Sequence, residues 1–315
     1  MLTRTLQDFA IKELQKHYKT EIYKGPFPMP KKKLLLRIKD KDGLICFPYD
    51  NIDRDVIMAG KKLKAISAFS VGYDQIDLNF AKKRKIKIGY TPNVLTNTTA
   101  DLTITLILDL LRRVTEGDRL IRNGKWTEVF GADTYVGEEI HGKVLGILGL
   151  GRIGKAVAKK AQTFGIDVLY HSRNRLSLKQ EKALKVKFAS INELFSKCDI
   201  ISIHIPYSKE THELVNKNLI KRMKKNSVII NTARGKIINE RNLIFALKRK
   251  LIGGAALDVF YYEPIGKNHP FSKMQNVVLS PHLGSSSIET RKKMAELTVE
   301  NLIRGLSGKK PIYSV

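Results

Sequence analysis

Apolar and polar positions alternate in blocks that predict short buried strands separated by amphipathic helices. The clearest block is Val144–Leu148, a continuously apolar run typical of a strand buried on both faces. A glycine-rich turn follows, and Lys155–Phe164 then has the alanines and spaced apolar positions of an amphipathic helix. Further strands are predicted at Asp167–His171, Asp199–Ile205, Ser227–Asn231, Gly254–Val259 and Val277–Ser280. This alternation predicts a doubly wound parallel sheet, the α/β Rossmann arrangement, over residues 96–285.

A smaller α/β domain is expected at the start of the chain. Its predicted strands are Leu2–Thr5, Glu21–Tyr23, Gly43–Phe47, Lys64–Phe69 and Ile86–Gly89. Its predicted helices are Asp8–Tyr18, Pro30–Lys39 and a short one near Asp53. The last helix, Ile288–Leu306, is expected to return to this domain. The predicted smaller domain is therefore discontinuous and consists of residues 1–95 and 286–315.

A long helix is predicted from Thr99 to about Val114, with Thr98 and Thr99 as capping residues. It is expected to continue to Asn123 after a kink near Gly117. Its first half is apolar on nearly all sides, which indicates burial between domains or against a partner. The loop that follows, up to Gly142, is interpreted as a projecting arm. We expect residues 99–142 to form a dimer contact, with ordinary packing inside the chain as the alternative.

Length and composition indicate two globular domains and argue against a membrane-spanning, secreted or disulfide-rich protein. The 315 residues are 43% hydrophobic, which is sufficient for two cores. The most apolar long segment, Leu102–Leu111, contains Asp109 and is too short to span a bilayer. No secretory leader is apparent at the start, and the two cysteines lack the paired spacing of a metal site or disulfide framework. We therefore expect a cytoplasmic protein with no membrane partner and no metal.

The charge balance is strongly basic, with 57 Lys and Arg against 30 Asp and Glu and a formal net charge of +27. The lysines are scattered over loops and the polar sides of helices, without interleaved aromatic residues or a recognisable nucleic-acid module. We interpret them as a solvated surface that helps to collect small anions. Nucleic acid is not an expected partner.

The turn after Val144–Leu148 carries the spacing of a dinucleotide clamp. Gly149 would permit the tight turn, Gly151 would let the backbone approach a pyrophosphate, and Gly154 would let helix and strand pack closely. Free amides at the start of the helix would face the phosphates. The alternative interpretation is a glycine-rich turn in some other α/β protein.

The next predicted strand helps to distinguish between cofactors. About twenty residues after the glycine turn, NAD-binding proteins usually place an acidic residue on the adenosine ribose. Here the strand is followed by Ser172, Arg173, Asn174 and Arg175, with no acid among them. The arginines would attract a 2′-phosphate. NADPH is therefore the expected cofactor, and NADH remains possible if the arginines are simply solvated.

Three polar side chains follow the last predicted strands. Arg234, Glu263 and His282 each come shortly after a strand, so they are expected at the same edge of the parallel sheet. A guanidinium can bind a carboxylate and polarise the adjacent carbonyl, and an imidazole can deliver a proton. A neighbouring glutamate can orient the imidazole and raise its pKa. This set predicts reduction of a 2-keto acid.

Several motifs together resemble the D-isomer-specific 2-hydroxyacid dehydrogenase family over nearly the whole chain. They are Ser70-Val71-Gly72-Tyr73-Asp74, the Gly149–Gly154 turn, Thr232-Ala233-Arg234-Gly235, Leu257-Asp258-Val259, Glu263-Pro264 and Pro281-His282-Leu283-Gly284-Ser285. Within the family, the segment Gly89–Asp101 closely resembles glyoxylate/hydroxypyruvate reductases, which commonly use NADPH.

The resemblance implies a role for each matching residue. Arg234 would bind the substrate, His282 would be the acid/base with Glu263 as its partner, and the amides of Val71 and Gly72 would hold the carboxylate. The implied cofactor contacts are Gly149, Gly151, Arg152, Ile153 and Gly154 at the pyrophosphate, Ser172, Arg173 and Asn174 at the ribose, Ile205, Pro206 and Thr232 along the cleft, and Asp258 at the carboxamide. The family fold implies a Rossmann domain, a smaller flavodoxin-like substrate domain, an active site in the cleft between them, and a homodimer.

The expected activity is reduction of glyoxylate and hydroxypyruvate to the D-2-hydroxy acid with NADPH. One alternative is the same chemistry on another 2-keto acid, such as 2-ketogluconate or pyruvate, with NADH. A second alternative is a non-catalytic NAD(H)-sensing protein that resembles the corepressors of the family.

Overall fold

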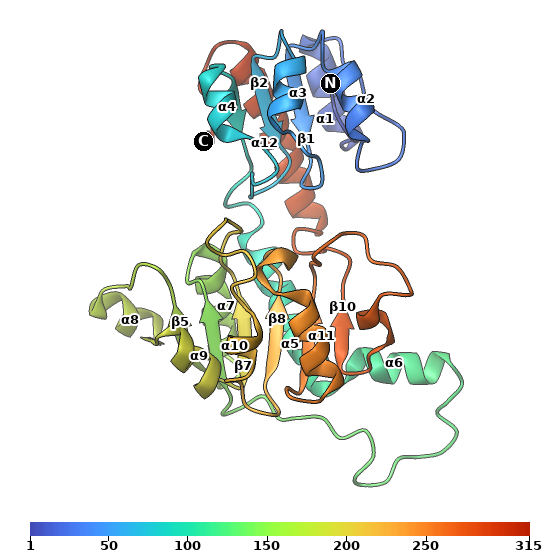
Figure 1. Cartoon of the computed structure of the whole chain (residues 1–315), viewed down its shortest axis with the longest axis vertical. Helices are drawn as coiled ribbons and strands as arrows, with labels where there is room; N and C mark the ends of the chain where they lie inside the picture. The colour runs from blue at the N-terminus through green and yellow to red at the C-terminus, as the bar shows by residue number, and fades with distance from the viewer. The chain divides into compact units, whose positions relative to one another are not determined.

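A computed structural model describes residues 1–315. The chain divides into two compact units, one formed by Met1–Leu95 with Ser286–Val315 and the other by Thr96–Ser285. Each unit is built around one parallel sheet with helices on both faces (Figure 1). The expected α/β fold class is confirmed.

The larger unit contains a seven-stranded sheet in the order β10-β9-β8-β7-β4-β5-β6, and all of its pairings are parallel. The strands are β4 (Val144–Leu148), β5 (Asp167–His171), β6 (Val186–Phe188), β7 (Ile200–Ile203), β8 (Val228–Asn231), β9 (Gly254–Leu257) and β10 (Val277–Leu279). The strand order reverses next to β4, whose neighbours are β5 and β7. In sheets of this kind, ligands bind outside the carboxyl ends of the strands at this switch point.

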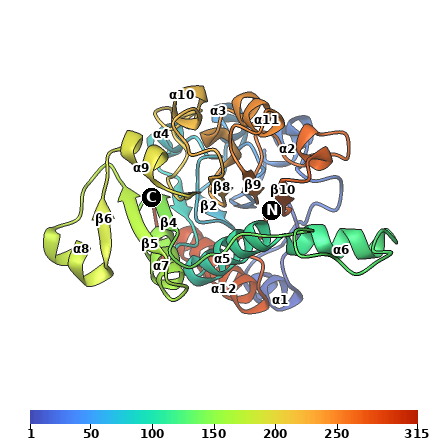
Figure 2. The same cartoon turned by 90° about the horizontal axis from the view of Figure 1, so that it is seen from below.

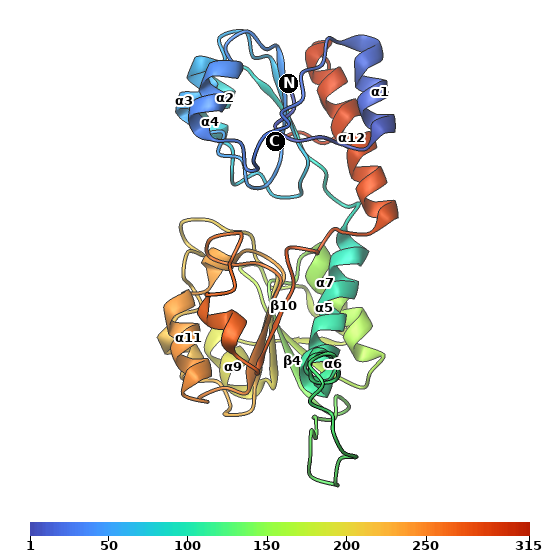
Figure 3. The ribbon, with the colours of Figure 1, turned by 90° about the vertical axis from the view of Figure 1, so that its right-hand side faces the viewer.

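Helices cover both faces of this sheet. They are α5 (Thr96–Arg112), α6 (Val114–Arg122), α7 (Arg152–Gln162), α8 (Leu178–Leu184), α9 (Ile191–Lys197), α10 (Lys217–Ile220) and α11 (Glu240–Lys248). Helices α5 and α7 lie on one face, and α9 and α11 lie on the other (Figure 3). Each face has its own apolar cluster, one around Phe195 and Ile201 and the other around Ile107 and Ile147. Burial of these clusters on both faces keeps the strand ends in fixed register.

The smaller unit has a three-stranded parallel sheet of β1 (Gly43–Cys46), β2 (Ala65–Ala68) and β3 (Lys87–Gly89), in that order. Its helices are α1 (Asp8–His17), α2 (Lys31–Arg37), α3 (Arg54–Ala59), α4 (Leu78–Lys83) and α12 (Ile288–Leu306). Helix α12 contacts all three strands and also packs against α1 on the same face (Figure 3). Met294, Val299 and Leu302 are buried in that contact, so the end of the chain completes the core of its first unit.

Several local predictions are wrong, each for a physical reason. The strands expected at Leu2–Thr5 and Glu21–Tyr23 reduce to isolated bridges of Leu2 with Ile22 and Ile45. Helix α4 and strand β6 were not predicted, because they are only six and three residues long and too short to show a helical or strand periodicity. The bounds of the other strands differ from the predicted ones by no more than two residues at either end.

The long helix also breaks at a different residue from the one predicted. It ends at Arg112, and Arg113 adopts a left-handed conformation with φ of 56° before α6 begins. Gly117 lies inside α6. Helix α5 starts at Thr96, so Thr98 and Thr99 are internal residues and not caps. The hydroxyl of Thr99 donates instead to the carbonyl of Gly284 at 2.7 Å.

Residues 123–142 have no regular secondary structure and follow α6 at one edge of the larger unit, and α8 lies at the opposite edge beside β6 (Figure 2). Apolar side chains of this arm are exposed, with 53% of Trp126 and 88% of Val129 accessible to solvent. The rings of Phe130 and Tyr135 stack with centroids 4.8 Å apart. The arm therefore contains a stacked aromatic pair and leaves other apolar side chains exposed.

No helix combines the length and the apolar character required to cross a membrane. No group of three or more His, Cys, Asp or Glu side chains is arranged to hold a metal ion.

Candidate active site

The glycine turn after β4 has a shape that only glycine fits. Gly149 has φ of 101°, and a Cβ there would lie 2.8 Å from the backbone nitrogen of Ile205. A Cβ on Gly154 would lie 2.3 Å from the carbonyl oxygen of Gly149. The amide of Gly149 donates to the carbonyl of His171 at 2.8 Å, which ties the turn to the end of β5. Larger side chains at either glycine would force the turn apart.

The start of α7 is open in the way that a bound pyrophosphate requires. Gly151 is its N-cap residue and provides no side chain to accept the first amides of the helix. A Cβ on Gly151 would meet nothing within 4 Å. Arg152 is exposed beside it and Ile153 is half-buried. Uncapped amides, the positive end of the helix dipole and open space together fit the diphosphate of a dinucleotide.

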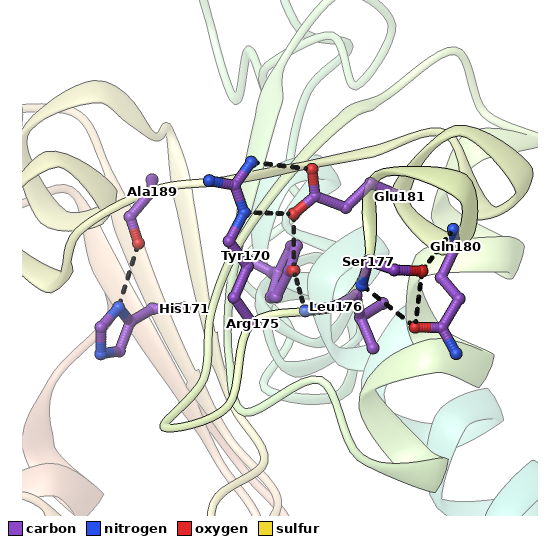
Figure 4. Close-up of polar contacts among 8 residues, drawn as sticks. All are labelled: Tyr170, His171, Arg175, Leu176, Ser177, Gln180, Glu181 and Ala189. Atoms are coloured by element: carbon purple, nitrogen blue, oxygen red, sulfur yellow. Dashed lines mark hydrogen bonds and ion pairs between the residues drawn. The ribbon is translucent and has the colours of Figure 1, made fainter.

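The four residues that follow β5 differ in their contacts, and not all of them are available to bind a ribose phosphate. The hydroxyl of Ser172 accepts a hydrogen bond from the amide of Leu150 at 2.8 Å, so it is fixed to the glycine turn. Arg173 and Asn174 are exposed. Arg175, expected to share in attracting a 2′-phosphate, is instead paired with Glu181 at 2.9 and 3.1 Å (Figure 4). Arg173 is therefore the remaining cation of this turn.

Glu181 is the centre of a buried polar network on α8 (Figure 4). Its carboxylate accepts from the hydroxyl of Tyr170 at 2.8 Å, and that hydroxyl accepts from the amide of Leu176 at 2.9 Å. The hydrogen bond from Arg175 is the main reason that the pKa of Glu181 lies below its ordinary value. The guanidinium also lies 5.1 Å from the ring of Phe188. The network thus fixes both ends of the turn between β5 and α8.

The segment after β7 lies against the glycine turn. Ile205 contacts the position where Gly149 lacks a side chain, and Pro206 is exposed next to it. The imidazole Nε2 of His204 is 2.8 Å from the hydroxyl of Ser202, and burial lowers the pKa of His204 to about 4. His204 is therefore uncharged near neutral pH. An uncharged ring here adds no cation to the switch point.

Arg234 follows β8 and is set in place by buried neighbours. The side-chain amide of Asn231, which is fully buried, donates to the carbonyl of Arg234 at 2.9 Å and accepts from the amide of Ala233 at 3.0 Å. The hydroxyl of Thr232 is 3.0 Å from that of Thr103 on α5. A Cβ on Gly235 would lie 2.0 Å from the backbone of Phe260, so this turn and the one after β9 are in contact.

His282 and Glu263 come from two neighbouring strand ends and meet directly. The imidazole Nδ1 of His282 is 2.8 Å from Oε2 of Glu263. The second oxygen of Glu263 accepts from the amide of Phe260 at 2.9 Å. The two side chains are 23% and 14% exposed, so each keeps some access to solvent. A carboxylate on Nδ1 fixes the ring so that Nε2 is the atom able to exchange a proton with a ligand.

Asp258 organises the turn that carries His282. Its carboxylate is fully buried and accepts from the amides of Leu283 at 2.7 Å and Gly284 at 2.9 Å, and from the hydroxyl of Ser280. Burial raises the pKa of Asp258 against these hydrogen bonds. His282 itself has φ of 55°, a left-handed conformation that a non-glycine residue adopts only when its surroundings hold it there.

The loop with Val71 and Gly72 belongs to the smaller unit and follows β2. The hydroxyl of Ser70 donates to the carbonyl of Gly72, and the side-chain amide of Gln75 donates to that hydroxyl at 3.2 Å. The carbonyl of Ser70 accepts from the amide of Thr91 at 2.9 Å. Val71 and Gly72 are both half-buried in this turn.

Some residues that shape the site were not predicted. Asn231, Ser280 and Glu181 each form hydrogen bonds with residues that are expected to act on substrate or cofactor, or with the turns that carry them. Asn231 ends β8 and Ser280 directly follows β10, so each is a small polar residue after an apolar run, a signal that points to buried hydrogen bonds. Nothing in the sequence near Glu181 sets it apart from a solvent-exposed helical glutamate.

A cavity of about 710 Å³ lies elsewhere in the larger unit. It is lined by Asn226, Gly253 and Asn276, which precede β8, β9 and β10, together with residues 136–138 of the arm. It is therefore at the amino edge of the sheet, opposite the strand ends that carry Arg234 and His282. Arg234, Glu263 and His282 do not line this cavity.

Comparisons with known proteins agree with this geometry. A family model described as "D-isomer specific 2-hydroxyacid dehydrogenase, NAD binding domain" matches residues 104–284. A glyoxylate reductase of Thermofilum pendens is 44% identical over 285 residues, covering 90% of this chain and 84% of the relative.

Solved structures show the same similarity. The TT0316 protein of Thermus thermophilus is 40% identical with a TM-score of 0.93, covering 100% of this chain and 98% of that one. An NADPH-dependent glyoxylate/hydroxypyruvate reductase of Sinorhizobium meliloti, solved with NADP and malonate, is 27% identical with a TM-score of 0.86, covering 100% and 95%.

A doubly wound sheet with a dinucleotide turn and an imidazole–carboxylate pair at its strand ends defines an NAD(P)-dependent oxidoreductase. The chain belongs to the D-isomer-specific 2-hydroxyacid dehydrogenase family, whose reaction interconverts a 2-keto acid and a D-2-hydroxy acid.

Proposed function

We propose that the protein reduces glyoxylate and hydroxypyruvate to the corresponding 2-hydroxy acids, glycolate and D-glycerate, with NADPH. The observation that carries the proposal is the 2.8 Å contact between His282 and Glu263, at strand ends next to the one that carries Arg234. These residues lie in the same unit as a glycine turn that fits a dinucleotide. Reduced nicotinamide supplies a hydride when it is bound.

Each side chain has a defined task in this reaction. Arg234 binds the substrate carboxylate and polarises the keto oxygen, assisted by the amides of Val71 and Gly72. As hydride reaches the keto carbon, His282 transfers the proton on Nε2 to the oxygen, and Glu263 stabilises the charged imidazole before that transfer. Water then returns a proton to His282. The keto acid thus gains one hydride and one proton, and the products are the hydroxy acid and the oxidised cofactor.

The residues that would hold the cofactor follow the strand ends. Backbone amides of Gly149, Gly151, Arg152, Ile153 and Gly154 would hold the pyrophosphate. Ser172, Arg173 and Asn174 would bind the ribose, and Ile205, Pro206, Thr232 and Asp258 would bind the nicotinamide. Oδ2 of Asp258 accepts one amide in the structure, which leaves a lone pair for the carboxamide nitrogen.

The preference for NADPH rests on the turn after β5. No acidic side chain follows β5 directly, and Arg173 is exposed there. The similar reductase of Sinorhizobium meliloti is described as NADPH-dependent. A cation without an acid at this position favours the 2′-phosphate over the two ribose hydroxyls.

We also propose a homodimer in which the arm is the main contact. The arm exposes the apolar side chains Trp126, Val129 and Val136, and covering them would gain free energy. The cavity of about 710 Å³ beside residues 136–138 offers a recess next to that surface.

The decisive experiment measures steady-state rates with glyoxylate, hydroxypyruvate and pyruvate, each with NADPH and NADH. Higher kcat/KM for glyoxylate with NADPH than for pyruvate with NADH is expected, and the reverse order would contradict the proposal. In the same assay His282→Ala should lower kcat by a factor of about 10² to 10⁴. Cofactor binding, followed by fluorescence, should be retained because the dinucleotide turn is untouched.

The matched control is His269→Gln. His269 also pairs with a glutamate, with Nε2 3.2 Å from Glu240, but it does not lie on the strand ends that carry the proposed site. Its kcat should stay within about twofold of wild type, because no proton transfer is assigned to it. An equal loss of activity in both variants would show that His–Glu pairs matter here for folding only.

A further inference from the structure

Helix α5, which lies along one face of the larger sheet (Figure 3), carries two buried threonines. Thr99 is 4% exposed and Thr103 is fully buried. The hydroxyl of Thr99 donates to the carbonyl of Gly284 at 2.7 Å, in the turn after β10. The hydroxyl of Thr103 is 3.0 Å from that of Thr232, two residues before Arg234. The helix is therefore tied to two of the turns that carry the proposed chemistry.

The protons of these hydroxyls have defined directions. A threonine hydroxyl has one proton to donate and two lone pairs that can accept. Thr103 donates its proton to the carbonyl oxygen of Thr99, one turn earlier on the helix, at 2.8 Å. In its contact with Thr232 it therefore accepts, and Thr232 is the donor. Without the oxygen of Thr103, the hydroxyl of Thr232, which is 9% exposed, would lose this acceptor.

Thr232 opens the turn that carries Arg234. The side-chain amide of Asn231 bonds with the amide of Ala233 and the carbonyl of Arg234, and Nη1 of Arg234 donates to the carbonyl of Ala233 at 2.8 Å. These bonds join residues of one turn to each other. The contact with Thr103 instead ties the turn to a helix whose apolar side chains belong to a core cluster. We therefore expect loss of this contact to let the turn shift relative to α5.

The hydroxyl of Thr103 adds direction to the interior and not packing. Valine has nearly the same shape, is similarly unfavourable in a helix and would be buried there without a polar group. Thr105 on the same helix donates to the carbonyl of Asp101 at 2.9 Å in the same way, but it is exposed. Thr105 therefore provides a comparison for the bond that Thr103 makes to its own helix.

We infer that Thr103 is a positioning residue for Arg234, which it fixes against α5 through the hydroxyl of Thr232. The inference rests on the proposed function, in which Arg234 binds the carboxylate of the keto acid and polarises its carbonyl. Thr99 ties the turn after β10 to the same helix, so the guanidinium and the imidazole of His282 are both positioned from α5. A displacement of about 1 Å in such a group is sufficient to lower a rate by a factor of about 10².

The test compares wild type with Thr103→Val and Thr103→Ser. For Thr103→Val, kcat/KM for glyoxylate with NADPH should fall by about 5-fold to 20-fold, because Arg234 is displaced. Oxamate, a carboxylate with an adjacent amide carbonyl that is not reduced, should bind the NADPH complex more weakly by a similar factor in calorimetry. The Kd of NADPH alone should stay within about threefold, because the distant glycine turn is untouched. Thr103→Ser keeps the hydroxyl and should stay within about twofold of wild type in each quantity.

Thr105→Val is the matched control. It removes a hydroxyl with the same bond to the helix backbone from the exposed side of α5, and should leave each quantity within about twofold of wild type. A loss as large as that in Thr103→Val would assign the effect to the helix itself and overturn the inference.

A second measurement separates positioning from a general loss of stability. In an Arg234→Lys background, Thr103→Val should lower kcat/KM by less than about twofold, since the group that it positions is absent. The same factor in both backgrounds would show that Thr103 acts independently of Arg234. Wild-type oxamate affinity in Thr103→Val, or an equal loss in Thr103→Ser, would also contradict the inference.

If Thr103→Val does not fold, Thr103→Ala is compared with Thr103→Ser, because both lack the methyl group and only one keeps the hydroxyl. Equal kcat/KM in these two variants overturns the inference. Wild-type protein that binds oxamate but reduces no keto acid overturns the proposed function, and the oxamate affinities then decide the role of Thr103. Wild-type protein that does neither overturns both.

Discussion

Arg173 is the residue on which the choice between the two nicotinamide cofactors is expected to depend. It is exposed after β5, whereas Arg175 two residues later is occupied by Glu181. Replacing Arg173 with Glu should lower kcat/KM for NADPH by about 10-fold to 100-fold, because the 2′-phosphate then meets a like charge in place of a cation. The value for NADH should change little or rise, since an acid at this point binds ribose hydroxyls. Steady-state kinetics with both cofactors at saturating glyoxylate measure the change.

Lys179→Glu is the matched control for this substitution. Lys179 is exposed on α8 close in sequence to the same turn, and the variant has the same change in net charge. If it lowers the NADPH value as much as Arg173→Glu does, general electrostatic attraction decides the preference and Arg173 has no direct contact.

The strand-end residues of the site could be predicted from the sequence, but the residues that hold them could not. A polar side chain within a few residues after an apolar strand run, as at Arg234 and His282, can be recognised from the sequence alone. The buried acceptors are not, because their partners are far apart in sequence: Asp258 receives the amide of Gly284, 26 residues later. The pairing of Arg175 with Glu181 also needs the turn geometry, which residue types alone do not specify.

At the scale of elements, the network around Glu181 is expected to govern how firmly the turn between β5 and α8 binds the ribose end of the cofactor. Glu181→Gln keeps a hydrogen-bonding group for Tyr170 but removes the ion pair with Arg175. We expect KM for NADPH to rise several-fold, by roughly three to ten times, while KM for glyoxylate is unchanged, because only the turn loosens. Arg175→Gln removes the other partner and should have the same effect.

The difference in stability between wild type and Glu181→Gln is expected to depend on pH. The pKa of Glu181 is lowered in the folded chain from its ordinary value of 4.5, mainly by Arg175. The ionised carboxylate of Glu181 therefore stabilises the folded chain fully at pH values above its ordinary pKa of 4.5. This stabilisation is lost as the pH falls through the lowered pKa of the folded chain. The difference in melting temperature between wild type and Glu181→Gln should shrink between about pH 6 and about pH 3. A difference that stays constant over this range would show that the ion pair does not contribute.

Helices and strands with a clear periodicity of apolar residues were predicted correctly, and those with a short or weak periodicity were not. The strand β4, its turn and α7 combine an apolar run, spaced glycines and helical periodicity, and α12 was predicted with the bounds Ile288–Leu306 that it has. Strand β6 is three residues long with an exposed lysine at its centre, so its apolar alternation is too short to recognise. The left-handed break at Arg113 depends on its contacts with Glu116 and Tyr135, which no local propensity indicates.

At the scale of the whole molecule, the exposed apolar side chains of the arm lead us to predict a homodimer. Light scattering should give a mass of about twice 35.7 kDa for the wild-type chain. Val129→Glu should shift the mass towards one chain, because a charge would be buried in the proposed contact. Leu178→Glu is the matched control, since Leu178 is a similarly exposed apolar residue on α8, 66% accessible. A wild-type protein of single mass at about 10 µM would contradict the dimer, since an obligate dimer would stay assembled at that concentration.

The return of α12 to the first unit has a consequence for the order in which the chain can fold during synthesis. Residues 96–285 form one uninterrupted stretch with a complete sheet, so this unit has all of its core before residues 286–315 are made. The sheet of β1, β2 and β3 is made before that unit but lacks the helix that covers one of its faces until α12 has been made. Ala65 and Ser67, which lie against Gly305 and Thr298 of α12, have no cover on that face until then. Residues 1–95 therefore precede 96–285 in the chain but complete their core after it.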